Sequence, residues 1–377
     1  MEAMPHQLLW LWRSLYESAA MFWEVLWALI LGFAISALLQ VFVSKERMTN
    51  TLGRAGLREM ALATAFGAAS SSCSYAAVAA ARTAFQKGAA LAPTLAFMFA
   101  STNLVFELGF VLWLLMGWRF VLAETVGAFV LIAVMWLIVS FTLPRGLEDE
   151  ARAHEEEKEG GHGGHDHGGH NMGGGRLRAV ADAFAMDWGM LWKEMLIGFV
   201  IAGLLAVLVS NGTWRALFLT HSGSPALRLW ENAVVGPLIA VLSFVCSIGN
   251  IPLASILWSG GISFGGVIAF IYADLIIVPL IIIYGKYYGR RTAAYITLVL
   301  FASMVIAGLV VDLLFSALHL IPIGPRPASA LSQAHFAWNY TTWLDLIALA
   351  VAAFLAAVHL RTANLRTAKA MTHEHHH

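Results

Sequence analysis

Long apolar runs separated by short polar segments dominate this chain, and several of the runs reach the roughly 20 residues that cross a bilayer as a helix. The period-two alternation typical of a transmembrane β-barrel is not found in these runs. The pattern therefore predicts an all-α polytopic membrane protein. The expected spans cover residues 20–44, 89–117, 120–143, 187–210, 262–285, 293–318 and 342–360.

Two further apolar segments, residues 59–86 and 230–260, are interrupted mid-length by small and polar residues. The first break reads SSSCS around Cys73, and the second reads CSIGNIP from Cys246. Backbone groups freed by such a break at membrane depth must be satisfied by protein or water, so each break indicates a cavity.

The two breaks align at an offset of 173 residues, which pairs Cys73 with Cys246, Ser74 with Ser247 and Gly88 with Gly261. The alternative is chance similarity between Ala- and Gly-rich membrane helices. An internal repeat is favoured because the Cys-Ser pairs coincide with the breaks. Interrupted segments at corresponding positions of two halves mark the binding site of many transporters.

The distribution of Lys and Arg favours inverted halves, with the N-terminus outside and the C-terminus in the cytoplasm. This topology requires each broken segment to be re-entrant. If the broken segments cross fully instead, the halves are parallel and the charge bias is weaker. The expected fold is thus two inverted repeats, each with a broken or re-entrant helical segment, plus an extra C-terminal span. The expected divisions are an interfacial helix in 1–19, the first repeat in 20–143, a cytoplasmic loop in 144–178, the second repeat in 179–318, an external loop in 319–341, and the last span with its tail in 342–377.

The loop 144–178 is acidic and then rich in Gly and His, a composition that predicts disorder. Its imidazoles could hold a divalent metal ion weakly, although a dispensable linker fits the same composition. Those metal-ligand candidates are His162, His165, His167 and His170. The sequence predicts no other cofactor.

Composition agrees with a membrane environment, since 59% of the residues are apolar and only 12% are charged. The mean hydropathy is +0.72. Net charge is zero, so no nucleic-acid partner is expected. The expected partners are lipid, a small inorganic or organometalloid substrate, and a proton or cation that drives transport. The sequence leaves a homo-oligomer open. We expect a multi-pass protein of the bacterial inner membrane, without a cleaved signal peptide.

The polar residues at the two breaks are the predicted substrate site. Thiols suit soft metals and metalloids, while hydroxyl and amide groups can hydrogen-bond a polar solute. Either cysteine could instead pack as a small apolar residue, and serine can simply let helices approach closely. The predicted substrate-binding residues are Ser72, Cys73, Ser74, Asn103, Cys246, Ser247 and Asn250.

A carboxyl group inside a span is costly unless it is paired, so Asp274 is the predicted coupling residue, with Glu107 as a second candidate. Glu24, Glu124 and Asp312 lie nearer span ends, where a solvated structural role is expected. Glycine and proline near the breaks are interpreted as residues that break helices or permit tight turns. These predicted hinges are Gly88, Gly249, Pro252 and Gly261.

The segments 66–101 and 244–279 resemble the signature repeats of the ArsP-type predicted permeases, which centre on a cysteine turn followed by a small-residue helix and a Gly-containing loop. The second repeat carries Cys246, Gly249 and Pro252, whereas the first has Ala76 and Ala79 at the last two positions. Characterised members of that family export trivalent organoarsenicals, so the resemblance implies efflux.

Three functions remain open from the sequence, and none of them is driven by nucleotide hydrolysis within this chain, since no phosphate-binding glycine loop of the G-x-x-x-x-G-K-[ST] type is found. The leading hypothesis is a secondary-active permease that exports a metalloid or metal species through a site between the repeats. One alternative is an intramembrane thiol-disulfide electron carrier using the two cysteines. The other is a passive channel.

Overall fold

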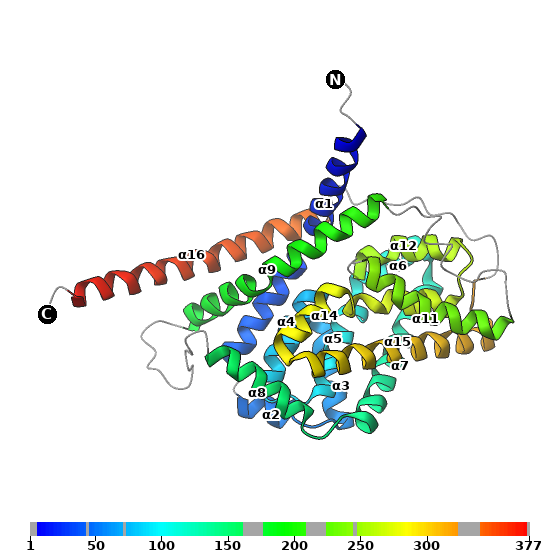
Figure 1. The fold of residues 1–377 in the computed structure, drawn as a ribbon, viewed down its shortest axis with the longest axis horizontal. Coiled ribbons are helices and arrows are strands. Elements are labelled where there is room, and N and C mark those ends of the chain that lie inside the picture. Colours follow the sequence, from blue (N-terminus) through cyan, green and yellow to red (C-terminus); the bar gives the residue numbers. More distant parts are fainter. Residues whose placement is uncertain are drawn as a thin grey trace.

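The computed structural model shows a chain built from helices, with no strand in its described residues (Figure 1). The structure describes residues 6–42, 45–70, 73–160, 176–208, 224–243, 247–322 and 340–374.

The helices fall into two groups separated by α8. The first group comprises α1 (His6–Phe42), α2 (Lys45–Leu52), α3 (Leu57–Ser70), α4 (Ser74–Gln86), α5 (Leu91–Asn103), α6 (Phe106–Met116) and α7 (Trp118–Thr142). After α8 (Leu147–Gly160) come α9 (Arg176–Leu208), α11 (Pro225–Ser243), α12 (Ser247–Ser259), α13 (Phe264–Ile271), the 3-10 helix η1 (Tyr272–Leu275), α14 (Val278–Tyr288), α15 (Arg290–Ala317) and α16 (Tyr340–Glu374).

Four helices in the described part of the chain are long and apolar enough to cross a membrane. They are Trp118–Thr142, Pro225–Leu242, Arg290–Ala317 and Thr342–Arg361. A bent pair, Phe264–Leu275 followed by Val278–Tyr288 at 43°, gives a fifth if it counts as one span. The prediction of an all-α, multi-pass membrane protein is therefore confirmed.

The helix bounds recur along the chain at the spacing seen in the sequence. Both ends of α12 lie 173 residues after the corresponding ends of α4. The starts of α5 and α13 are separated by the same offset, and those of α7 and α15 by one residue less. Gly88 and Gly261, which follow α4 and α12, adopt matching left-handed φ values of 103° and 106°. The offset of 173 residues seen in the sequence thus also separates the bounds of several helices.

The expected continuous span 262–285 is interrupted in the structure after η1. Pro279 has no N–H to donate to the Leu275 carbonyl, so a helix cannot continue through this point without losing a hydrogen bond. The Leu275 carbonyl accepts instead from the Tyr284 hydroxyl at 2.9 Å. This side-chain hydrogen bond satisfies a backbone group that the break would otherwise leave unpaired inside the membrane.

The expected span 89–117 is interrupted as well, although it has no proline at the break. The last three residues of α5, Ser101, Thr102 and Asn103, are polar and buried. Their side chains bond back to carbonyls of the preceding turn, including Ser101 Oγ to Met98 O at 3.0 Å and Asn103 Nδ2 to Phe99 O at 3.1 Å. Such local side-chain bonds compete with helix continuation, and α6 starts anew at Phe106.

The loop expected to be disordered over 144–178 contains a helix, α8, that docks on the first group. Arg152 donates to the Phe85 carbonyl at the end of α4 and to the Ala89 carbonyl at 2.7 Å. Glu148 accepts from the Leu91 backbone N–H at the start of α5 at 2.8 Å. The two side chains thus hydrogen-bond to backbone groups at helix ends, which have no partner within their own helix. The acidic composition of the segment alone did not reveal this docking. The rest of the loop up to residue 175 lies outside the described residues.

A buried ion pair fixes α8 to α4. Arg82 Nε lies 2.8 Å from Glu155 Oε1, with side-chain exposures of 11% and 3%. The Arg82 guanidinium also stacks on the Tyr287 ring of α14, 3.9 Å from its centroid. Arg82 therefore joins α4, α8 and α14 at one end of the bundle.

We expect Glu155→Gln to destabilise the protein by about 3 kcal/mol, because the change leaves a buried guanidinium without its carboxylate. The measurement is thermal unfolding of the purified protein in detergent. Glu150→Gln, on the same helix, is the matched control. Glu150 forms an ion pair with Arg291, and the two side chains are 53% and 71% exposed. Loss of this exposed pair should therefore cost less than about 1 kcal/mol of stability. Equal destabilisation by both substitutions would contradict this account.

The three longest helices lie beside one another and partly away from the rest of the bundle (Figure 1). Phe33 of α1 packs edge-on against Trp188 of α9, and Asp345 of α16 accepts from the Trp27 backbone N–H at 2.9 Å. The segment 7–18, expected to lie on the membrane as a separate helix, continues without a break into the first span as part of α1.

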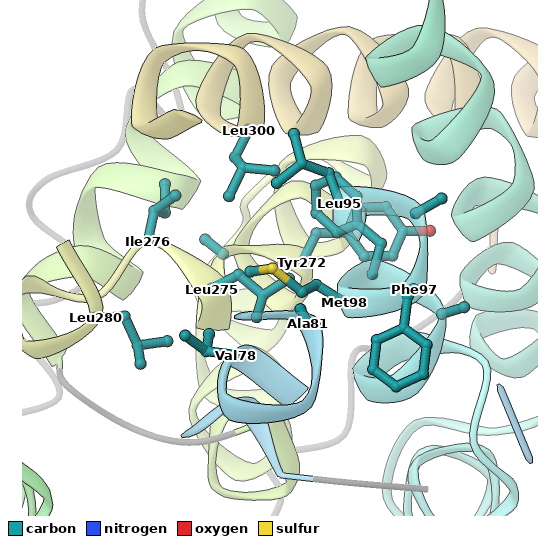
Figure 2. Close-up of a cluster of buried hydrophobic side chains, with 14 of the residues drawn as sticks. Val78, Ala81, Leu95, Phe97, Met98, Tyr272, Leu275, Ile276, Leu280 and Leu300 are labelled. Atoms are coloured by element: carbon teal, nitrogen blue, oxygen red, sulfur yellow. The ribbon is translucent and has the colours of Figure 1, made fainter. Parts of the chain in front are cut away.

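The core lies where the two groups meet. Figure 2 shows Val78 of α4 and Met98 of α5 beside Tyr272 and Leu275 of η1, with Leu300 of α15 above them. All five side chains are almost fully buried. The second group thus inserts its irregular turn η1 between the short helices of the first.

Helices α7 and α15 pack in opposite directions. Thr142 Oγ1 at the end of α7 lies 3.0 Å from the Tyr295 hydroxyl near the start of α15. At the other end of the bundle, Phe264 contacts both Phe120 of α7 at 4.8 Å and Phe315 of α15 at 5.4 Å between ring centroids. The start of α7 therefore lies near the end of α15.

Candidate functional site

A carboxylate at the centre of the core forms the candidate site. Asp274 lies in η1 and is fully buried. Its Oδ2 atom accepts hydrogen bonds from Ser74 Oγ at 2.7 Å and from Ser247 Oγ at 2.5 Å. The two serine oxygens are 3.5 Å apart. Asp274 thereby connects the two residues that the repeat pairs with each other.

The starts of two half-helices bring these serines together. Ser74 is the first residue of α4, after Cys73 in extended conformation, and Ser247 is the first residue of α12. The N-terminus of a helix carries partial positive charge and unpaired N–H groups. Two such ends meeting at Asp274 make the position suitable for small polar or anionic groups.

Several buried polar atoms near these breaks have no hydrogen-bond partner within the described part of the chain. Asp274 uses only Oδ2, and its Oδ1 is unpaired. Asn250 is fully buried with both side-chain amide atoms unpaired, and it lies one turn after Ser247, on the same face of α12. Asn103 has an unpaired Oδ1 at the end of α5. Because buried polar groups are nearly always hydrogen-bonded in folded proteins, these atoms have capacity to bind a solute or a proton.

The other predicted site residues have no contact with Asp274 among the hydrogen bonds of the described residues. Cys73 is half-buried beside Ser74. Asn103, a predicted substrate-binding residue, bonds to its own helix through Nδ2. Ser72 and Cys246 lie outside the described residues, and Glu107 falls in the first turn of α6 with a side chain that is not described.

The predicted hinges separate into two kinds. Gly88 and Gly261 occupy left-handed turns after α4 and α12. A side chain at Gly88 would be strained by its φ value and would also lie 2.1 Å from Thr49 Oγ1. Gly249 and Pro252 lie inside α12, which continues through both. Neither residue therefore interrupts the helix that starts at Ser247.

The metal-binding prediction for His162, His165, His167 and His170 falls outside the described residues. Within the residues that the structure describes, no group of three or more His, Cys, Asp or Glu side chains could hold a metal ion.

Glu124 was expected to be a solvated residue near a span end, and the structure contradicts this. It is 2% exposed, and neither carboxyl oxygen has a hydrogen-bond partner among the described residues. Hydropathy could not reveal this burial, because it depends on how α7 packs against η1. Asp312 matches its expected structural role, since its Oδ2 accepts from the Gly265 backbone N–H at 2.6 Å.

Membrane-spanning helices around a buried polar site at helix ends are typical of a membrane transport protein. Residues 14–313 match the ArsP_1 family of predicted permeases, and the chain belongs to this family.

A curated relative supports the same conclusion. Over 325 residues the chain is 43% identical to the protein named Putative permease Rv2963 from Mycobacterium tuberculosis. This alignment covers 83% of the chain and 79% of the relative. No solved structure matches the chain at a significant level.

Proposed function

We propose that this permease is a secondary-active exporter of a metalloid or metal species, with its substrate path between the two repeats in the bacterial inner membrane. The observation that carries the proposal is the cluster of Ser74, Ser247 and Asp274, in which one buried carboxylate bridges two equivalent half-helices. A site shared by both halves lets their relative movement open it to either side of the membrane.

Re-entrant segments and inverted halves form part of the proposal. The Ala90 backbone N–H, after α4, donates to the Leu52 carbonyl, before α3, at 2.8 Å. Both ends of the α3–α4 pair thus lie close together, as a re-entrant segment requires. The opposite directions of the equivalent helices α7 and α15 support inversion. In this topology α8 is cytoplasmic, and α7 starts at the external face.

Asp274 supplies the coupling in this mechanism. While ionised, it accepts hydrogen bonds from both Ser74 and Ser247 and holds the half-helices together. Binding of a proton to the carboxylate weakens these charge-assisted bonds, so α4 and α12 can move apart. A cation bound at Oδ1 would compete with the serines in the same way.

The substrate class follows from the ligand atoms near the breaks. Cys73 lies beside Ser74 and offers a thiol, a soft ligand for metalloids and thiophilic metals. The amide of Asn250 and the Oδ1 atom of Asp274 can hydrogen-bond to hydroxyl or water ligands of the bound species.

Everted membrane vesicles test the function directly. We expect vesicles containing the protein to accumulate one member of a panel of Zn, Co, Ni, Cu, arsenite and methylarsenite in response to a proton gradient. Cys73→Ser should weaken the apparent affinity for that species by about tenfold, the effect of losing roughly 1.4 kcal/mol of binding. Vesicles without the protein and vesicles treated with a proton ionophore are the controls.

Two outcomes contradict the proposal. Flux of a panel compound that is unaffected by the ionophore would indicate a passive channel. No flux of any compound, together with a Cys73 to Cys246 disulfide that responds to ambient redox potential, would favour a thiol-disulfide electron carrier.

A further inference from the structure

Glu124 is a buried acid that the coupling mechanism above does not use. It lies in α7, is 2% exposed, and has no hydrogen-bond partner for either carboxyl oxygen within the described residues. An ionised carboxyl without a cation or hydrogen-bond donors is costly in a membrane interior, and binding a proton removes that cost.

Tyr272 joins Glu124 to the turn that carries Asp274. Its hydroxyl donates to the Glu124 backbone carbonyl at 3.0 Å, and it lies two residues before Asp274 in η1. Gly127 makes this contact sterically feasible, because a side chain there would place its Cβ 2.2 Å from the Tyr272 hydroxyl. The close approach of α7 and η1 therefore depends on a glycine one turn after Glu124.

Tyr272 and Asp274 are the ionisable side chains that η1 brings toward Glu124 in the described part of the chain, while α15 presents the apolar Val311 to this part of α7. A negative charge on one buried carboxyl group disfavours a negative charge on the other. Ionisation of both carboxyl groups at once is unfavourable in so apolar a region, so their protonation is linked.

The position of Glu124 along α7 places it near one end of the bundle. It is six residues into α7, which is about 9 Å from the start of that helix. One turn nearer that end, Phe120 packs on Trp258 at 5.3 Å and on Phe264 at 4.8 Å. Glu124 therefore lies one turn further into α7 than this aromatic cluster.

We propose that Glu124 is a second proton-binding site, which exchanges a proton with Asp274 and with the solution at the end of the bundle where α7 starts. The inference rests on the proposed function for its role in transport. In the exchange, the Glu124 carboxylic acid gives its proton to the Asp274 carboxylate and becomes ionised, and it then regains a proton from the solution at that end.

Infrared difference spectroscopy tests proton binding without any substrate. Full-length protein in lipid membranes is shifted from neutral to acidic pH, and the C=O stretching bands of protonated carboxyl groups are recorded. We expect Glu124→Gln to remove one band and Glu124→Asp to shift the frequency of that band. Asp274→Asn should remove a second band. In Glu124→Gln this second band should appear over a different pH range than in the wild type. Asp312→Asn, which changes a half-buried acid bonded to a backbone N–H, should leave both bands in place. An unchanged spectrum in Glu124→Gln overturns the proposal.

Transport measurements then separate proton exchange from a structural role. For the compound moved in the vesicle panel, Glu124→Gln should lower proton-driven accumulation by about tenfold while exchange at equal pH stays within about twofold of wild type. Equal loss of both activities overturns the role in proton exchange. If no panel compound moves, the proposed function fails, and the infrared bands still decide whether Glu124 binds a proton.

Discussion

Asp274→Asn is expected to lower proton-driven transport by about a hundredfold or more, within the range that a positioned proton-transfer group contributes. Asparagine nearly matches the size of aspartate but cannot bind and release a proton. Its amide also presents N–H donors where Asp274 presents only acceptors to Ser74 and Ser247. The measurement is initial-rate accumulation of the panel compound in proteoliposomes with an imposed pH gradient.

The control for Asp274→Asn is Asp312→Asn, which also removes a carboxylate from the second half of the chain. Asp312 bonds to the start of α13 and lies outside the serine cluster, so transport should fall by less than about threefold, the effect of losing well under 1 kcal/mol. Elution of both variants as a single peak in detergent would show that they are folded. Wild-type transport by Asp274→Asn would mean that the driving ion binds elsewhere.

The centre of the site could be predicted from the sequence because two independent signals converge there. The repeat singled out Ser74 and Ser247, and the cost of burying a charge singled out Asp274. Neither signal indicated that all three side chains would share one hydrogen-bonded cluster. That contact depends on η1 returning to the starts of α4 and α12, a tertiary arrangement that local patterns do not encode.

The breaks within two expected spans show a different limit of sequence reasoning. Pro279 is visible in the sequence, but the apolar run around it matches a continuous span in hydropathy. The break after Asn103 has no comparable marker, since three polar side chains end α5 by bonding back to its own carbonyls. Hydropathy measures how well a segment suits lipid, and both broken segments suit lipid as well as intact helices do.

Helix α8 was missed for a related reason. Its acidic composition is typical of solvated or disordered segments, yet Glu148, Arg152 and Glu155 each contact a group that the helices of the first half expose. Arg82 supplies the buried counter-charge from 73 residues away. Pairs so distant in sequence leave no periodic signal, so composition predicted the charge of this segment and not its structure.

Removing both serine hydroxyls is the second large effect that we expect. A hydrogen bond to a charged group contributes about 1.5 to 3 kcal/mol, so Ser74→Ala and Ser247→Ala should each lower transport by roughly tenfold or more. Because the repeat makes the two serines equivalent, the single changes should be similar in size. The double change should cost more than the sum of the single ones, since each serine partly compensates for the loss of the other at the shared Oδ2 atom.

A double-mutant cycle on proton-driven accumulation measures that coupling. Ser303→Ala is the matched control, because Ser303 is a fully buried serine whose hydroxyl donates to the Val299 carbonyl of its own helix, α15, at 2.7 Å. Its removal should leave transport within about twofold of wild type. If only one of the two site serines matters, the halves do not contribute equally and the site belongs to a single repeat. Equal and coupled losses would instead mean that Asp274 acts on both half-helices at once, as alternating access between inverted halves requires.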